Sequence, residues 1–107
     1  MSIAAFWHGV LPAITTPFTA NGDIDHDFLA KHANQLVDAG CTAIVPLGSL
    51  GEAATLSVDD KLAILKTLVT ALQGRVPVVP GIASLATGEA VALAKAAKEL
   101  GLSLIHI

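Results

Sequence analysis

The chain has 107 residues, of which 53% are apolar and only 14% are charged, and its formal net charge is −3. Soluble domains average roughly 25% charged residues, and a small domain, which has much surface per volume, should carry more charge than this one does. The composition excludes a disordered chain and suits part of a larger apolar core. Six Lys and Arg residues, spread along the chain, form no basic patch for nucleic acid or an anionic membrane.

The single cysteine, Cys41, excludes an internal disulfide framework and a multi-cysteine metal site. We interpret it as a buried structural thiol. No apolar run reaches the roughly 18 residues that a membrane span requires. No Lys or Arg precedes the apolar N-terminus, as a secretory signal would require. We therefore expect a cytoplasmic protein with no membrane or nucleic-acid partner.

The first strand and helix are predicted between residues 10 and 40. Residues 10–15 form a short apolar run that predicts a buried strand. Asn21 and Gly22 are a turn signal. Asp25 is placed to cap a helix that begins at His26 or Asp27, and Gly40 is placed to end it.

Asp23, Asp25 and Asp27 alternate as in a calcium-binding loop. An EF-hand loop also needs Gly at its sixth position and Glu at its twelfth, where this chain has Phe28 and Asn34. We interpret the acidic run as a capped helix start. The four histidines show no metal-ligand spacing, so the sequence predicts no metal site.

The second unit follows the same order. Residues 42–47 predict a second strand, and a loop follows from Gly48 to Gly51. Ser57, with Asp60 three residues later, resembles a capping box. The helix that begins there carries leucines at helical spacing and is expected to end at Gly74.

A third strand is predicted at residues 76–82, followed by a helix that Thr87 is expected to cap and Gly101 to end. The strands are apolar on both faces, as in parallel sheets that helices cover. This β-α-β-α-β-α order leaves a (β/α)8 barrel or a doubly wound sheet. No GxGxxG motif follows the first strand, which disfavours dinucleotide binding. A barrel needs about 250 residues, so this chain would supply three or four of its eight βα units.

Three segments together resemble one known family. Residues 44–57 read IVPLGSLGEAATLS, residues 9–18 read GVLPAITTPF and residues 75–81 read RVPVVPG. In this order and at this spacing they resemble the dihydrodipicolinate synthase / N-acetylneuraminate lyase family over residues 9–101. The resemblance implies the N-terminal part of an α/β fold, the (β/α)8 TIM barrel, usually homotetrameric. It also implies a class I aldolase or lyase without a cofactor, in which a lysine forms a Schiff base with pyruvate or another 2-keto acid.

The resemblance implies that the loop after the second strand binds substrate through Gly48, Ser49, Leu50 and Gly51. The two glycines let backbone N–H groups approach an anion closely. Ser49 is the candidate catalytic residue, relaying protons with a tyrosine, because its hydroxyl both donates and accepts. Leu50 departs from the family's usual Thr and lacks the hydroxyl, which is worth about 0.5–1.5 kcal/mol in one hydrogen bond. This departure puts standard dihydrodipicolinate synthase activity in doubt.

Three further residues are expected to support the site. Thr15 and Thr16 end the first strand and are expected to brace the loop, although a turn ahead of Pro17 explains them equally well. Glu52 is expected to be structural, accepting hydrogen bonds from loop N–H groups.

The resemblance places the Schiff-base lysine on strand 6 and the catalytic tyrosine on strand 5, both beyond residue 107. We expect every lysine present to face solvent on a helix and none to be the nucleophile, so residues 1–107 alone should be inactive. These lysines are Lys31, Lys61, Lys66, Lys95 and Lys98.

Residues 102–107 depart from the family's continuation and match one reading frame of a common sequencing-adaptor end. We therefore expect a barrel part at residues 1–101 and a non-native tail at residues 102–107, the alternative being a divergent fourth strand.

Three other interpretations stay open. One is a dehydratase or hydratase-aldolase of the same family, another a non-catalytic barrel-derived binding protein, and the last a self-standing small α/β domain. Later βα loops choose the second substrate in such barrels, so this sequence does not name it.

Overall fold

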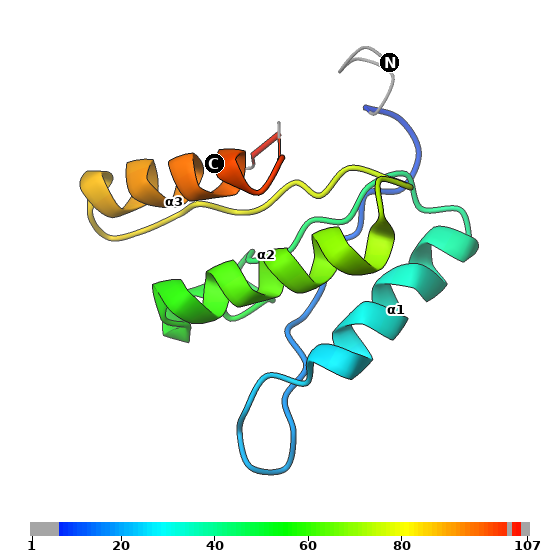
Figure 1. Cartoon of the computed structure of the whole chain (residues 1–107), viewed down its shortest axis with the longest axis horizontal. Helices are drawn as coiled ribbons and strands as arrows, with labels where there is room; N and C mark the ends of the chain where they lie inside the picture. The colour runs from blue at the N-terminus through cyan, green and yellow to red at the C-terminus, as the bar shows by residue number, and fades with distance from the viewer. Residues whose placement is uncertain (1–6, 103, 106–107) are drawn as a thin grey trace.

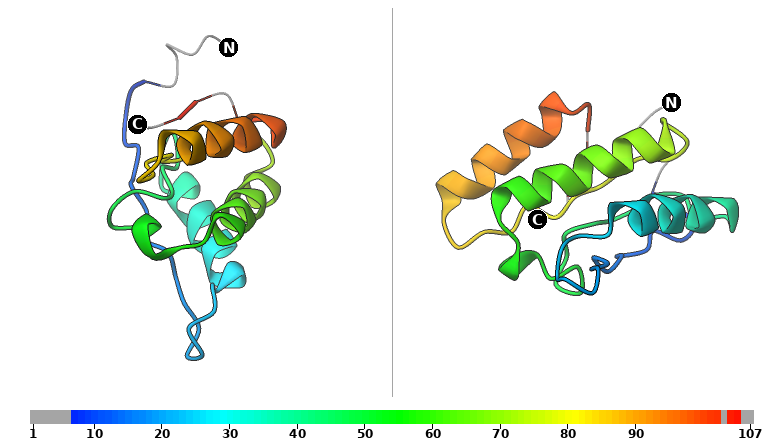
Figure 2. Two further views of the ribbon diagram at one scale, coloured as in Figure 1. Left: turned by 90° about the vertical axis from the view of Figure 1, so that its left-hand side faces the viewer. Right: turned by 60° about the horizontal axis from the view of Figure 1, so that its bottom comes forward.

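The computed structural model describes residues 7–102, 104 and 105. It contains the α-helices α1 (His26–Asp38), α2 (Val58–Leu72) and α3 (Thr87–Glu99), and one short 3₁₀ helix, η2 (Ala53–Thr55). The α-helices form one layer, with α2 between α1 and α3, and extended segments of the chain form a second layer beside it (Figures 1 and 2). Within the described residues, no helix is long and apolar enough to cross a membrane.

Three extended segments, residues 10–14, 42–46 and 77–81, lie parallel as neighbours in chain order. Parallel bridges join Ala13 to Val45 and Ile44 to Val78. The Ile14 N–H donates to the Val45 carbonyl at 3.0 Å, and the Val79 N–H donates to the Ile44 carbonyl at 2.9 Å. The predicted parallel order is therefore present.

The prediction of regular strands at residues 10–15, 42–47 and 76–82 was wrong in one respect, because the described chain pairs there only through isolated bridges. The cause is a set of prolines without N–H groups, which cannot donate to a ladder. They contribute carbonyls instead: Pro12 accepts from Val45, Pro46 from Gly81 and Pro77 from Ile44.

Side chains alternate between the two faces of the extended layer, as extended backbone requires. Ile14, Ile44 and Val78 pack in one buried cluster with the leucines of α2 and with Leu29 and Ala33 of α1. Ala43 and Val79 face the other way and pack with Leu104. Both faces are thus apolar, as expected of a parallel sheet that is covered on both sides.

Two of the three predicted helix caps are confirmed. An Asp25 carboxylate oxygen accepts from the Phe28 N–H, and the Ser57 hydroxyl oxygen accepts from the Asp60 N–H, each at 3.0 Å. The third prediction was wrong: Thr87 is the first residue of α3, and the N-cap is Ala86, which makes no side-chain capping bond. The chain leaves the helices at Gly40, Gly74 and Gly101, all with positive φ, as predicted.

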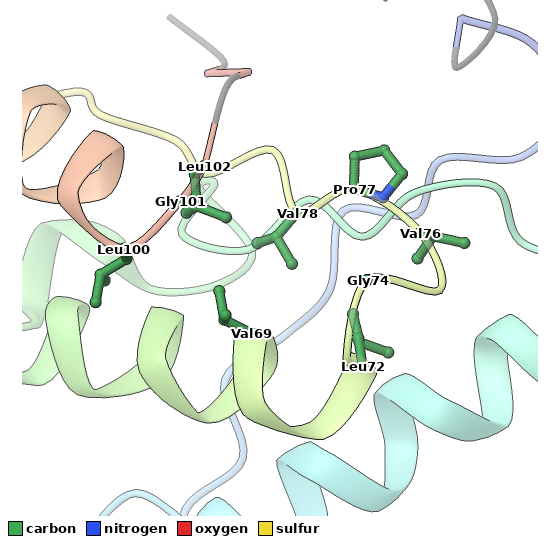
Figure 3. A pocket seen from close by; sticks show the side chains of 9 residues that line it. All are labelled: Val69, Leu72, Gly74, Val76, Pro77, Val78, Leu100, Gly101 and Leu102. Carbon is green, nitrogen blue, oxygen red and sulfur yellow. The ribbon is translucent and has the colours of Figure 1, made fainter. Parts of the chain in front are cut away.

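A hollow of about 220 Å³ lies between α2, α3 and the amino end of the third segment (Figure 3). Val69 and Leu72 of α2 face Val76 and Val78 across it (Figure 3). Its remaining lining comes from Gly74, Pro77, Leu100, Gly101 and Leu102. None of these side chains is charged or carries a hydroxyl or sulfur, so this end of the layer offers packing and no chemistry.

Candidate active site

The candidate site is the loop that follows the second segment. It begins at Leu47, whose φ is 65°, and ends at Glu52, whose φ is 58°. Left-handed backbone is unfavourable for residues with a Cβ and costs of order 1–3 kcal/mol when the surroundings enforce it. At Leu47 the enforcing contact is burial, because its side chain is only 2% exposed. The chain therefore turns sharply while Leu47 stays in the core.

The loop's hydrogen bonds leave three N–H groups over. Gly51 and Glu52 donate to the carbonyls of Gly48 and Ser49, each at 3.1 Å. Among the described residues, the N–H groups of Gly48, Ser49 and Leu50 have no backbone or side-chain acceptor. Backbone donors are normally satisfied, and successive unpaired N–H groups in a turn form an anion-binding concavity. The loop can therefore accept a carboxylate.

Thr16 fixes this loop to the first segment. Its side chain is buried, and its hydroxyl donates to the Gly51 carbonyl at 2.6 Å. A Cβ at Gly51 would lie 3.2 Å from the Ile14 carbonyl oxygen, so glycine is what lets the two backbones approach. Thr15 is exposed and makes no printed side-chain bond. Of the two threonines expected to brace the site, the bracing bond belongs to Thr16.

A hollow of about 670 Å³ lies at the carboxyl ends of the second and third segments. Gly48 and Ser49 line it from the loop, Lys61 from the first turn of α2, and Ser84 and Glu89 from the chain after the third segment. Apolar side chains, among them Leu47, Ala53 and Leu56, complete the wall. The hollow thus combines apolar walls with a few polar groups, as small-ligand sites do.

Lys61 contradicts the expectation that every lysine faces solvent, since it is only 4% exposed. The reason is its helical position. Residue 61 lies on the same stripe of α2 as Ile64, Leu65 and Leu68, all of which are buried. This spacing was visible in the sequence and could have identified Lys61 as a buried side chain. Ser84 was also missed, and nothing in its local pattern distinguishes it from a loop serine.

The remaining predicted site residues lie at the loop's surface. Ser49 is exposed at the mouth of the hollow, and Leu50 is 73% exposed and does not line it. The Glu52 carboxylate accepts no hydrogen bond among the described residues, contrary to expectation. Glu52 acts through its backbone, whose carbonyl accepts from the Thr55 N–H and hydroxyl, both at 3.0 Å. Its left-handed backbone is thereby tied to η2.

Within residues 7–102, 104 and 105, no group of three His, Cys, Asp or Glu side chains comes together as a metal site would require. Cys41 is a free, half-buried thiol.

A sequence profile of the dihydrodipicolinate synthetase family matches residues 6–107. The 4-hydroxy-tetrahydrodipicolinate synthase of Pseudomonas aeruginosa is 42% identical over 93 residues, which make up 87% of this chain and 32% of that protein. The chain thus spans about a third of the length of the curated relatives that it matches.

Solved structures agree with this match. Dihydrodipicolinate synthase from Bacillus anthracis is similar over 90% of this chain and 33% of its own, with a TM-score of 0.85 and 38% identity. N-acetylneuraminate lyase from Mycoplasma synoviae gives a TM-score of 0.88 at 36% identity, over 94% of this chain and 35% of its own. YagE from E. coli K12, solved in complex with pyruvate, gives 0.88 at 30%, over 92% and 33%. The chain therefore belongs to the dihydrodipicolinate synthetase family, and its three βα units are the N-terminal part of that family's (β/α)8 barrel.

Proposed function

We propose that this chain provides the carboxylate-binding loop of a Schiff-base aldolase or lyase that acts on pyruvate or another 2-keto acid. The observation that carries the proposal is the set of unpartnered N–H groups at Gly48, Ser49 and Leu50, at the carboxyl end of a barrel segment. Active sites of (β/α)8 barrels lie at this end. The pyruvate complex of the similar protein YagE supports the choice of ligand.

In the proposed reaction, the loop N–H groups hold the keto acid's carboxylate through charge-assisted hydrogen bonds. A lysine amine then attacks the keto carbon, the carbonyl oxygen leaves as water, and an iminium links lysine and substrate. Ser49 passes protons to and from this centre together with a tyrosine. By resemblance, the lysine and the tyrosine belong to strands 6 and 5, beyond residue 107.

Residues 1–107 alone are inactive in this proposal, because none of their lysines ends an extended segment. The active form is a cytoplasmic homo-oligomer, a tetramer by resemblance, that uses no cofactor. A dehydratase or hydratase-aldolase on the same imine is the second candidate. The exposed Leu50, which lacks the hydroxyl of the family's usual threonine, favours it over standard dihydrodipicolinate synthesis.

The test uses the full-length product of the gene that encodes this chain, read through the codon for Gly101. Borohydride reduces an iminium to a stable amine, so treatment with pyruvate and borohydride should add one pyruvate-derived group per subunit. Peptide mapping should place it on a lysine beyond residue 107. No adduct, or an adduct on a lysine between residues 31 and 98, would contradict the proposal.

Ser49→Ala in the same protein should lower kcat by about 10²–10⁴-fold, the usual contribution of proton transfer. Its iminium should still be trapped, because the nucleophile is elsewhere. Thr70→Ala, at an exposed position on α2, is the matched control and should leave kcat unchanged.

A further inference from the structure

Lys61 is the one charged side chain that the structure buries within its described part. The backbone N–H of Lys61 donates to the Ser57 carbonyl at 3.0 Å, which fixes the residue in the first turn of α2. Its side chain lies on the buried stripe of the helix and reaches the wall of the 670 Å³ hollow. The position of Lys61 is therefore set by the core and not by solvent.

No anion of the described protein neutralises Lys61. The ion pair found within the described residues is Arg75 with Asp38, on the far side of α1 and α2. Asp59 and Asp60 share the turn of Lys61 but are exposed, and Glu89 lines the same hollow from α3 without forming a salt bridge. Burying a charge is costly unless it is paired. The vacant partner position faces the hollow.

A second polar group in the hollow also lacks a partner. The Ser84 hydroxyl oxygen is shielded from solvent and makes no hydrogen bond among the described residues. It follows the third segment, whereas Lys61 comes from α2, so the two line the hollow from different parts of the fold. Rotation about the Cα–Cβ bond of Ser84 would let its hydroxyl donate to a ligand.

We propose that Lys61, assisted by Ser84, binds the carboxylate of a small organic acid in this hollow. The apolar wall at Leu47, Ala53 and Leu56 suits a short carbon chain beside the carboxylate. Glu89, on the same wall, repels a doubly charged anion such as phosphate and so favours a monocarboxylate. The site does not depend on the chemistry under "Proposed function", because it uses neither Ser49 nor an iminium.

Acetate and its neutral counterpart acetamide are the probes. Line broadening of their methyl NMR signals reports weak binding to the full-length protein. Acetate should bind and acetamide should not. Lys61→Met keeps the apolar stem and removes the charge, so acetate should bind about tenfold or more weakly, whereas Lys61→Arg should retain binding. Lys66→Met, at an exposed position on the same helix, should bind as the wild type does.

Far-ultraviolet circular dichroism establishes that each variant is folded. Acetate binding that is absent, that Lys61→Met leaves unchanged or that acetamide matches would overturn the proposal. If acetate binding depends on Lys61 and borohydride trapping with pyruvate survives Lys61→Met, the ligand is a carboxylate other than the substrate. If both are lost, the ligand is the substrate's own carboxylate. If pyruvate is trapped by neither protein while acetate still needs Lys61, only the proposed function fails.

Discussion

The two hollows of this fold lie at opposite ends of the same extended layer and differ in character. At the amino end, the 220 Å³ hollow is lined by Val69, Leu72, Val76 and similar side chains (Figure 3). At the carboxyl end, the 670 Å³ hollow holds Ser49, Lys61, Ser84 and Glu89. Charged and hydroxyl groups, unpaired donors and non-glycine left-handed backbone gather at the second.

The backbone explains the difference. Helices return to the amino end through glycines, such as Gly74, which adopt positive φ without strain. At the carboxyl end, Leu47 and Glu52 adopt positive φ despite their side chains. Strain of this kind persists where a fold positions functional groups. One end therefore stabilises the layer, and the other presents groups to a ligand.

Gly81→Val should break the carboxyl end most severely. A Cβ at residue 81 would overlap the carbonyl oxygen of Leu47, which is backbone and cannot swing aside. We expect urea unfolding of the full-length protein to show a loss of about 3 kcal/mol or more, the upper range for overpacking. Gly88→Ala, where nothing lies within 4 Å, is the control and should be neutral or slightly stabilising. Equal stability of the two variants would show that the close approach at Gly81 is not required.

Thr16→Val should have a smaller effect on the same end. It removes the 2.6 Å hydrogen bond to the Gly51 carbonyl and leaves that oxygen without its buried donor. The free energy of unfolding should fall by about 1–3 kcal/mol. Thr15→Val changes an exposed neighbour and should stay within about 0.5 kcal/mol of the wild type. A larger loss at Thr15 than at Thr16 would contradict the assignment of the brace.

Ser57→Ala should have the smallest effect of the three. It removes the cap that accepts from the Asp60 N–H at 3.0 Å, and caps of this kind contribute about 1 kcal/mol. Thr87→Ala is the matched change at α3, whose N-cap makes no side-chain bond, and it should cost less than the loss of a cap does. Chemical denaturation of both variants measures the difference, and equal losses would argue against a special role for Ser57.

The sequence predicted the helices well because their signals are local. Asp25 and Ser57 cap the helices that their neighbours predict, and Gly40 and Gly101 follow the ends. The extended segments were predicted as regular strands because the apolar pattern is strong, but prolines limit their pairing. A proline's missing N–H could have been weighed at the same stage.

The site was predicted less completely, because it depends on which segments meet. The motif at residues 48–51 identified the loop. The bond from Thr16 to Gly51, 35 positions apart, has no local signal. Lys61 was assigned to the surface because lysine usually lies there, although its spacing to Leu65 and Leu68 indicated the core. Ser84 reaches the hollow only through the path of the third segment.

The central claim is that the loop N–H groups of Gly48, Ser49 and Leu50 receive a 2-keto acid's carboxylate. Amide NMR of the full-length protein, labelled with ¹⁵N at Gly, Ser and Leu, tests it directly during titration with pyruvate. We predict that these three amide signals shift together and saturate, and that the neutral amide of pyruvate leaves them in place. Pyruvate binding that shifts other amides while these three stay unmoved would contradict the account.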